Sequence, residues 1–302
     1  METHYEWQLS INEAPLKGEM SVLFSGQGKP VEGHFIGPAV HDYYLLHVVL
    51  DGEGVFETLG ESYKLSAGDA FVIFPDILVR YEASRTKPWS YMWVAFDGEG
   101  TEQMLRGIGI APDNAVIRAC PLTRLRRQFL RIRRSIGASG TPALSNLEAS
   151  AWLRMVLTDV GRVLQDGSSG QTGRADHAGM SGERAVPYSG SGHRSFRSVD
   201  QAIRLLTLQF GQYTSIDQIA RTLGYHRSHL TKLFKDATGM SPMQYLYKVR
   251  MKKAETLLAS DLTVAQVAAS VGYNDPLFFT KQFRKWSGKS PTAFRKHQAE
   301  RE

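Results

Sequence analysis

Basic and hydroxyl side chains recur at helical spacing in two short segments near the end of this 302-residue chain. Once the apolar positions of residues 227–237 are turned inward, the outward side chains are Arg227, Ser228, Thr231, Lys232 and Lys235. The corresponding outward set of the second segment is Pro276, Leu277, Thr280, Lys281 and Lys285. Lys and Arg suit guanine edges and phosphates, whereas Thr, Pro and Leu suit thymine methyl groups. Both segments therefore have side chains suited to binding double-stranded DNA.

A short apolar helix and a glycine precede each segment, so the whole pattern occurs twice. In the first copy, Ile216, Ile219 and Leu223 line one face of a predicted helix. Gly224 then supplies a positive φ that ends the helix and turns the chain. Gly272 holds the same place 48 residues later. Each copy therefore predicts a helix-turn-helix unit.

An ordinary helical hairpin is the alternative for one copy, but the repetition and the outward basic chemistry favour DNA binding. Acids are scarce near these outward faces, where only Asp236 and Asp275 lie close by. Either Asp275 or Asn274 is expected to cap the second helix. Residues 242–260 between the copies predict a helix of about seventeen residues, roughly 25 Å long. That helix is long enough to hold the two units near one DNA turn apart, about 34 Å.

Residues 199–297 resemble the DNA-binding domain of AraC/XylS-family transcription regulators. The matching motifs are Arg250-x-x-x-Ala254-x-x-Leu257-Leu258, Val267-Ala268-x-x-Val271-Gly272-Tyr273, Phe279-x-x-x-Phe283-Arg284-Lys285 and Gly288-x-Ser290-Pro291-x-x-Phe294-Arg295. The resemblance implies a cytoplasmic, sequence-specific transcription regulator with double-stranded DNA and RNA polymerase as partners. The family is associated with the role of activator, and the sequence leaves activation and repression both open for this chain.

The distribution of charge agrees with binding a polyanion at one end. Residues 194–302 hold 18 Lys and Arg against 8 Asp and Glu, a net charge of +10. Residues 1–193 hold 18 against 22, a net charge of −4, so the whole chain carries +6. A basic C-terminal domain attached to an acidic partner domain is typical of a DNA-binding protein.

Short apolar runs separated by turn residues predict a β-rich N-terminal domain. The expected strands lie at 43–50, 55–59, 63–65, 70–74, 78–83 and 89–96. Helical stripes follow, one through Leu122, Leu125, Phe129 and Ile132, and another from Leu144 to Val156. A Gly- and Ser-rich stretch predicts a linker at 166–198. The expected domains are thus 1–165, a cupin-like sensing and dimerisation domain, and 199–302, the DNA-binding domain.

The segments 45–54, 65–75 and 89–96 resemble the cupin-type sensor domain of the sugar-responsive AraC-type regulators. The expected fold class is therefore α+β multidomain: a cupin-like β-barrel or jelly roll with C-terminal helices, then an all-α domain with two helix-turn-helix motifs. The resemblance implies that aromatic side chains stack on a small-molecule effector, and the sugar-responsive branch implies that this effector is a sugar. The candidates for ligand binding are Tyr81, Trp93, Tyr44 and Trp89. The alternative is that these rings are barrel core.

A metal-dependent cupin enzyme with an accessory DNA-binding domain is the rival hypothesis from another class. Metal cupins usually carry a His-x-His pair and a Glu on one strand and a further His on a later strand. Here His34, His41 and His47 form no such pair. No catalytic framework, metal site or cofactor is therefore expected.

Three further features bear on setting and assembly. The lone Cys120 permits no intramolecular disulfide, which suits a reducing cytosol, and we expect neither a signal peptide nor a membrane span. The arginines from Arg124 to Arg134 are expected on the solvated face of a helix rather than on nucleic acid.

Helix 144–165 is expected to form a homodimer interface, since this family commonly pairs there, with intradomain packing as the alternative. A ligand-independent dimer, in which the barrel only pairs two copies, remains a third hypothesis.

Overall fold

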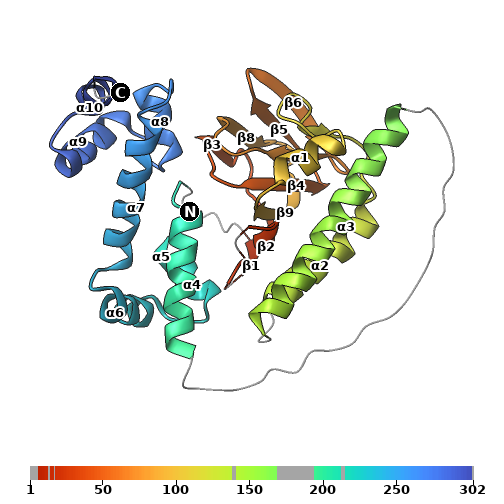
Figure 1. The fold of residues 1–302 in the computed structure, drawn as a ribbon, viewed down its shortest axis with the longest axis horizontal. Coiled ribbons are helices and arrows are strands. Elements are labelled where there is room, and N and C mark those ends of the chain that lie inside the picture. Colours follow the sequence, from red (N-terminus) through yellow and green to blue (C-terminus); the bar gives the residue numbers. More distant parts are fainter. Residues whose placement is uncertain are drawn as a thin grey trace.

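The computed structural model describes residues 6–12, 14–16, 18–137, 141–168, 194–211 and 215–300, and Figure 1 shows a β-rich domain beside a helical one. Most of the predicted linker, 166–198, lies outside these residues. Residues 166–168 belong to the end of one helix, and another helix begins at Arg194. The part of the chain that the structure describes contains no helix long and apolar enough to cross a membrane.

Two antiparallel sheets form the N-terminal domain, which confirms the expected β-rich fold. One sheet has the strand order β1-β2-β9-β4-β7-β10, and the other has the order β3-β8-β5-β6. The strands are β1 (Glu6–Ile11), β2 (Ser21–Lys29), β3 (Phe35–Ala39), β4 (Tyr44–Asp51), β5 (Glu53–Thr58), β6 (Glu61–Ser66), β7 (Ala70–Ile73), β8 (Val79–Ala83), β9 (Ser90–Asp97) and β10 (Val116–Ile117). From β4 to β9 these strands follow the predicted ones within a few residues.

The first three strands, β1 to β3, were not predicted from the sequence. The second of them is central, because β2 hydrogen-bonds to β9 along its length, from Ser21 opposite Asp97 to Gly28 opposite Tyr91. Its sequence, SVLFSGQGK, carries two glycines and two serines. Glycine is depleted in strands since it costs entropy and packs no side chain, so local propensity did not reveal β2. Gly26 is needed there because the ring of Trp93 lies directly against it.

Alternation along β4 separates two environments. On one face, Tyr44 packs against Phe74 and Phe96. On the other face, His47 packs against Tyr81 of the opposite sheet. Successive side chains of a strand point to opposite faces, so odd positions of β4 face the space between the sheets and even positions face away. The inward face becomes the candidate effector site.

Helices cover the outer face of the larger sheet. They are α1 (Thr101–Gly107), α2 (Leu122–Gly137) and α3 (Pro142–Ser168), and α2 and α3 lie side by side in Figure 1. Leu125, Phe129 and Ile132 are buried as predicted. Apart from the half-buried Arg133, the arginines of α2 are exposed, which agrees with a solvated face. Buried Asp159 of α3 accepts a hydrogen bond from Gln128 of α2 at 2.7 Å and joins the two helices.

The C-terminal domain is helical throughout its described residues, as predicted. Its helices are α4 (Arg194–Leu208), α5 (Ile216–Thr222), α6 (Arg227–Thr238), α7 (Pro242–Leu257), α8 (Val264–Ser270), α9 (Pro276–Ser287) and α10 (Pro291–Ala299). The predicted turns are confirmed: Gly224 has φ 73° and Gly272 has φ 81°. Ser215 and Thr263 begin α5 and α8 with matching capping boxes, so the two helix-turn-helix units start in the same way.

Candidate DNA-binding and effector-binding sites

Helix α6 presents the first candidate DNA-binding set. Leu230 and Phe234 are fully buried on one side of the helix. Arg227, Ser228, Lys232 and Lys235 are exposed on the other. Thr231 is half-buried, and its hydroxyl donates to the carbonyl of Arg227 at 2.8 Å, so it offers mainly its methyl group. The exposed face of α6 thus combines cationic groups with a small apolar contact.

Helix α9 repeats this arrangement one unit later. Its N-cap is Asp275, whose carboxylate accepts from the amide of Leu277 at 2.8 Å, so Asp275 rather than Asn274 caps the helix. Phe279 and Phe283 are buried, while Pro276, Leu277, Lys281 and Lys285 are exposed. Thr280 is half-buried and donates to the carbonyl of Pro276 at 2.9 Å, as Thr231 does to Arg227 in α6.

An apolar protrusion on α9 was not among the predicted site residues. The side chain of Leu277 is 76% exposed, and the neighbouring Phe278 is 50% exposed although it is aromatic. Its exposure beside Leu277 adds an apolar surface to the N-terminal end of the second candidate recognition helix.

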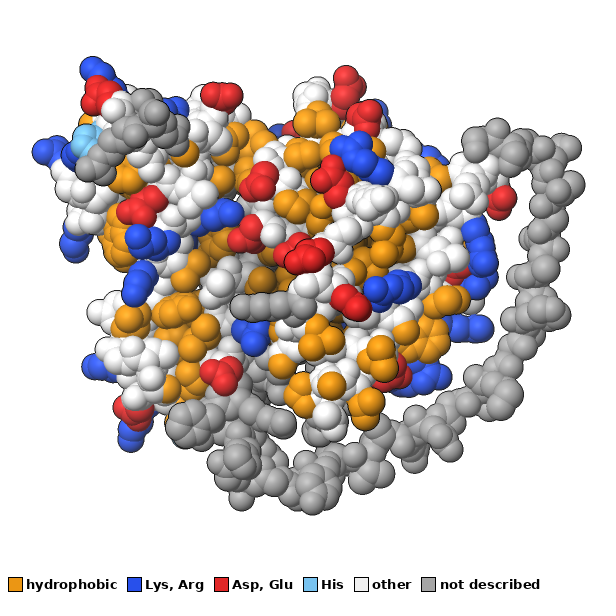
Figure 2. Space-filling model, viewed as in Figure 1, with side chains coloured by type: hydrophobic (Ala, Val, Ile, Leu, Met, Phe, Trp, Pro, Cys, Tyr) orange, Lys and Arg blue, Asp and Glu red, His pale blue; other side chains and the backbone are white. Residues whose placement is uncertain are grey.

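The connecting helix α7 fixes the two units relative to each other. It has 16 residues, or about 24 Å of length, and in Figure 1 it runs from α6 at one end to α8 and α9 at the other. Tyr247 donates to the carbonyl of Gln282 at 3.0 Å, and Trp286 donates to Glu255 at 2.8 Å, which attaches α9 to α7. Lys and Arg side chains project along the outer edge of these helices in Figure 2.

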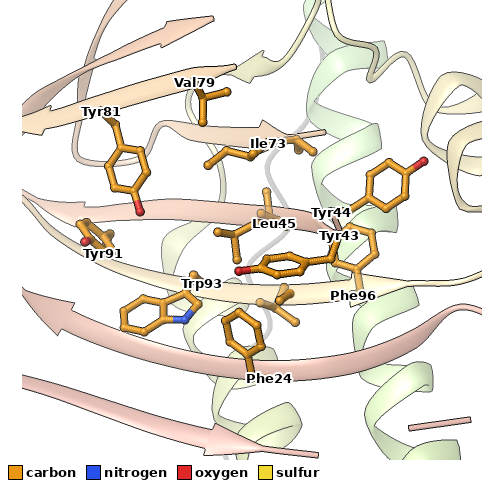
Figure 3. Packing of buried hydrophobic residues seen from close by; sticks show 14 of the residues in the cluster. Phe24, Tyr43, Tyr44, Leu45, Ile73, Val79, Tyr81, Tyr91, Trp93 and Phe96 are labelled. Carbon is orange, nitrogen blue, oxygen red and sulfur yellow. The ribbon is translucent and has the colours of Figure 1, made fainter. Parts of the chain in front are cut away.

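The inward face of the barrel is an aromatic cluster. The ring of His47 stacks on Phe71 with 4.7 Å between centroids, and it lies 5.2 Å from Tyr81 and 5.1 Å from Tyr91. Trp93 is 6.3 Å from His47, and Trp89 packs behind Phe71 at 6.1 Å. Figure 3 shows Tyr81 above Tyr91 and Trp93, with the rings converging between the sheets.

The structure brings together three of the four predicted effector residues. Tyr81, Trp89 and Trp93 all face the interior and are at most 6% exposed. Tyr44 does not join them, because its position on β4 turns it to the opposite face of the sheet, against Phe96. Tyr44 and His47 are three positions apart on β4, so their side chains lie on opposite faces of the strand.

His47 is a candidate ligand-binding residue that sequence analysis considered only as a metal ligand. It is 2% exposed, and its Nδ1 atom has no hydrogen-bond partner among the described residues. Burial, with a smaller contribution from the charge of His41, lowers the pKa of His47 to about 3, so the imidazole is neutral at physiological pH. Buried polar atoms are normally hydrogen-bonded, which makes this nitrogen available to a bound hydroxyl group.

An open hollow of about 520 Å³ lies elsewhere, on the outer face of the smaller sheet. Its lining includes Glu57, Lys64, Arg80 and Glu82. Arg80 forms ion pairs with both Glu57 and Glu82, so much of the charge at this hollow is already neutralised within the protein. The hollow shares Tyr81 with the aromatic cluster, but His47, Trp89, Tyr91 and Trp93 do not line it.

The described residues include no group of three His, Cys, Asp or Glu side chains able to hold a metal ion. Cys120 is buried, and burial together with the neighbouring charge of Asp69 raises the pKa of its thiol to about 12. A thiol with so high a pKa is a poor nucleophile at neutral pH, which fits a packing role.

Comparison with known proteins matches both domains. A helix-turn-helix domain family covers residues 194–297, and an AraC-like ligand binding domain family covers residues 22–157. The Msm operon regulatory protein of Streptococcus mutans serotype c is 30% identical over 280 residues, which span 92% of this chain and 93% of that protein. The lactose operon transcription activator of Staphylococcus xylosus is 27% identical over 84% of each chain. The raffinose operon transcriptional regulatory protein RafR of Pediococcus pentosaceus is 26% identical over 92% of this chain and 94% of its own.

The packing of Trp93 on Gly26 gives a prediction about the barrel interior. In Gly26→Ala the new methyl group overlaps the Trp93 ring and approaches the carbonyl of Gln8. We expect a loss of about 1–3 kcal/mol in the free energy of unfolding from overpacking. The matched control is Gly107→Ala, where a Cβ meets nothing within 4 Å and the helix favours alanine. Urea denaturation should show a lower midpoint for Gly26→Ala only; equal midpoints would contradict the packing described.

Proposed function

The chain belongs to the AraC family of transcription regulators, and we propose that it binds its operator through α6 and α9 while the barrel holds a small-molecule effector. It is a DNA-binding regulator with a ligand-binding domain. The observation that carries the proposal is the repeated chemistry of the two recognition helices. In each helix, a threonine hydroxyl donates a hydrogen bond to the carbonyl four residues earlier, and an exposed lysine directly follows that threonine.

The separation of α6 and α9 supports contact with two successive turns of one DNA face. Helix α7 spans about 24 Å between the units, and each recognition helix adds to that separation, which approaches one helical turn of about 34 Å. We propose that Lys232 and Lys281 approach base edges. Arg227, Lys235 and Lys285 then contact phosphates, and Thr231, Thr280, Pro276 and Leu277 supply methyl and apolar contacts. Ser228, at the start of α6, is assigned to a phosphate.

A sugar is the effector that the barrel interior supports best. Aromatic rings stack on the C–H faces of sugars, and the unpartnered Nδ1 of His47 offers a hydrogen bond to a hydroxyl group. Two of the relatives are named for lactose and raffinose operons, which supports the same chemical class. Tyr81, Trp93 and His47 are the proposed contacts, with Trp89 as support behind them.

An enzymatic role has less support than regulation. The three relatives are named as operon regulators or transcription activators, and their similarity extends over both domains of the chain. We therefore propose a cytoplasmic, non-catalytic protein that acts at promoters with RNA polymerase. Residues 1–165 and 199–302 are its proposed sensing and DNA-binding domains, joined by 166–198.

The exposed apolar face of α3 supports a homodimer. Leu144 and Leu147 are 66% and 68% exposed, and Met155 is 40% exposed. Ala151 lies between them on the same side, while Val156 is buried against the barrel. Large exposed aliphatic residues at helical spacing mark a protein–protein contact. A second copy of the same face is the proposed partner.

The two recognition helices should make separate contacts with DNA. We expect Lys232→Ala and Lys281→Ala each to weaken specific binding by about 1–3 kcal/mol if they reach base edges. Lys248→Ala, on the exposed side of α7, is the matched control and should bind like the parent. Footprinting should show each variant losing protection at a different place, about one helical turn apart. Loss at the same base pairs in both variants would overturn the tandem arrangement.

The effector site is tested by Trp93→Phe, which keeps most of the ring volume and removes the indole N–H group. With lactose and raffinose as probes, we expect the parent to gain thermal stability and Trp93→Phe to need a higher sugar concentration for the same gain. Binding to DNA without sugar should stay unchanged. Tyr81→Phe tests the facing ring in the same titration. Identical titrations for the parent and both variants would place the sugar outside this cluster.

The dimer is tested by Leu147→Glu. A charged side chain at the centre of the exposed stripe opposes burial against a second copy, so sedimentation should show a monomer where the parent is a dimer. Leu59→Glu is the matched control, because Leu59 is 57% exposed at a turn far along the chain from α3. A monomeric parent, or a dimeric Leu147→Glu variant, would rule out this interface.

A further inference from the structure

The segment between β3 and β4 leaves the barrel and contacts the DNA-binding domain. Tyr43 is 1% exposed, and its hydroxyl donates to the carbonyl of Leu208, in the last turn of α4, at 2.9 Å. Its neighbour Asp42 pairs with Lys253 of α7 at 3.6 Å. Strand β3 itself packs against α8. Residues far apart in the sequence therefore join the two domains at three helices.

Partial burial makes this contact more than a surface ion pair. The side chain of Lys253 is 16% exposed and that of Asp42 is 49% exposed, so one partner of the pair is largely buried and the other is half-exposed. Burial raises the pKa of Tyr43 well above its usual value of 10, which keeps the hydroxyl protonated as a donor. His41, 7% exposed, packs beside Tyr43 with 5.3 Å between the ring centroids.

On the DNA-binding side, the contacts fall at the junction of the two helix-turn-helix units. Arg250 of α7 donates to the carbonyl of Phe210 at 2.8 Å, two residues beyond Leu208. Gly211 lies so close to the carbonyl of Ser270, the last residue of α8, that no Cβ fits there. The residues that directly follow α4 thus contact both the connecting helix and the first helix of the second unit.

On the barrel side, Tyr43 belongs to the aromatic interior. Its ring meets Phe24 of β2 edge to face, with 5.3 Å between centroids, and Figure 3 shows its hydroxyl end directed toward the side of Trp93. Phe24 is two residues from Gly26, on which Trp93 lies. One tyrosine is therefore packed in the interior of the sensor and bonded to the DNA-binding domain.

We propose that Asp42 and Tyr43 form a latch that holds the DNA-binding domain against the barrel and passes changes in the barrel interior to the end of α4. The second part rests on the proposed effector site. The latch leaves α6 and α9 on the side of the domain away from the barrel, as Figure 1 shows. It therefore sets the direction in which the recognition helices point relative to α3, instead of covering them.

Charge reversal with rescue tests the latch in the full chain without DNA or sugar. Asp42→Lys places two cations together and should increase the radius of gyration measured by small-angle X-ray scattering. Adding Lys253→Asp restores the opposite charges and should return the radius to that of the parent. Lys248→Asp changes the charge of an exposed lysine on the same helix and should leave the radius unchanged. An unchanged radius in Asp42→Lys, or no rescue in the double variant, overturns the latch.

Tyr43→Phe tests the hydrogen bond while keeping the ring packed. Hydrogen exchange of the amides at 205–210 should become faster in this variant, because the carbonyl of Leu208 loses its donor and the end of α4 is less restrained. Exchange within α2 and α3 should stay as in the parent, which shows that the barrel remains folded. Unchanged exchange at 205–210 would contradict the latch. Since neither experiment contains DNA or sugar, failure of the proposed function would not affect these outcomes.

Discussion

The attachment of both helix-turn-helix units to one connecting helix is the constraint on which DNA recognition depends. Tyr247 and Glu255, on α7, bind α9 through the carbonyl of Gln282 and the indole of Trp286. Phe234 of α6 packs on Tyr245 at the other end of α7. Because both recognition helices pack on one continuous helix, their separation is fixed in the free protein. Binding to DNA therefore costs little conformational entropy. A pair of units on a loose tether would lack this advantage.

The barrel depends on a different constraint, the alternation of side chains in β4 and β9. One face of these strands packs against helices and gives the domain a rigid outer layer that carries the exposed stripe of α3. On the other face, the side chains of His47, Tyr91 and Trp93 lie together between the sheets. Glycine at position 26 allows β2 to pass beneath Trp93, so the strand with weak local propensity supports the proposed ligand contacts. The same domain thereby presents the proposed dimer surface outward and the proposed effector site inward.

Much of the C-terminal domain was predictable because its determinants are local. Spacings of three and four residues, glycines at positive φ and capping residues act within a few positions, so the turns at Gly224 and Gly272 could be assigned from the sequence alone. The sequence also narrowed the cap of α9 to Asn274 or Asp275, and the structure shows that it is Asp275. The strands from β4 to β9 also follow local alternation. The missed strands β1 to β3 are defined instead by partners distant in the sequence, as Gly26 is by Trp93.

The candidate sites divide in the same way. The outward residues of α6 and α9 can be predicted from the period of a helix. Predicting the aromatic cluster also requires knowing which face of β4 turns inward. That face excludes Tyr44 and adds His47. The contact of Asp42 with Lys253 joins residues more than two hundred positions apart, and no local pattern indicates it.

Selection of DNA from a random-sequence duplex pool by the purified full-length chain tests the central claim most directly. Because α7 fixes the recognition helices, we predict that each bound half-site contains two preferred blocks whose centres lie about 10 base pairs apart on one DNA face. The blocks should keep this spacing in every enriched sequence. Enrichment of a single block, variable spacing between blocks, or no enrichment over the starting pool would contradict recognition by two rigidly connected helix-turn-helix units.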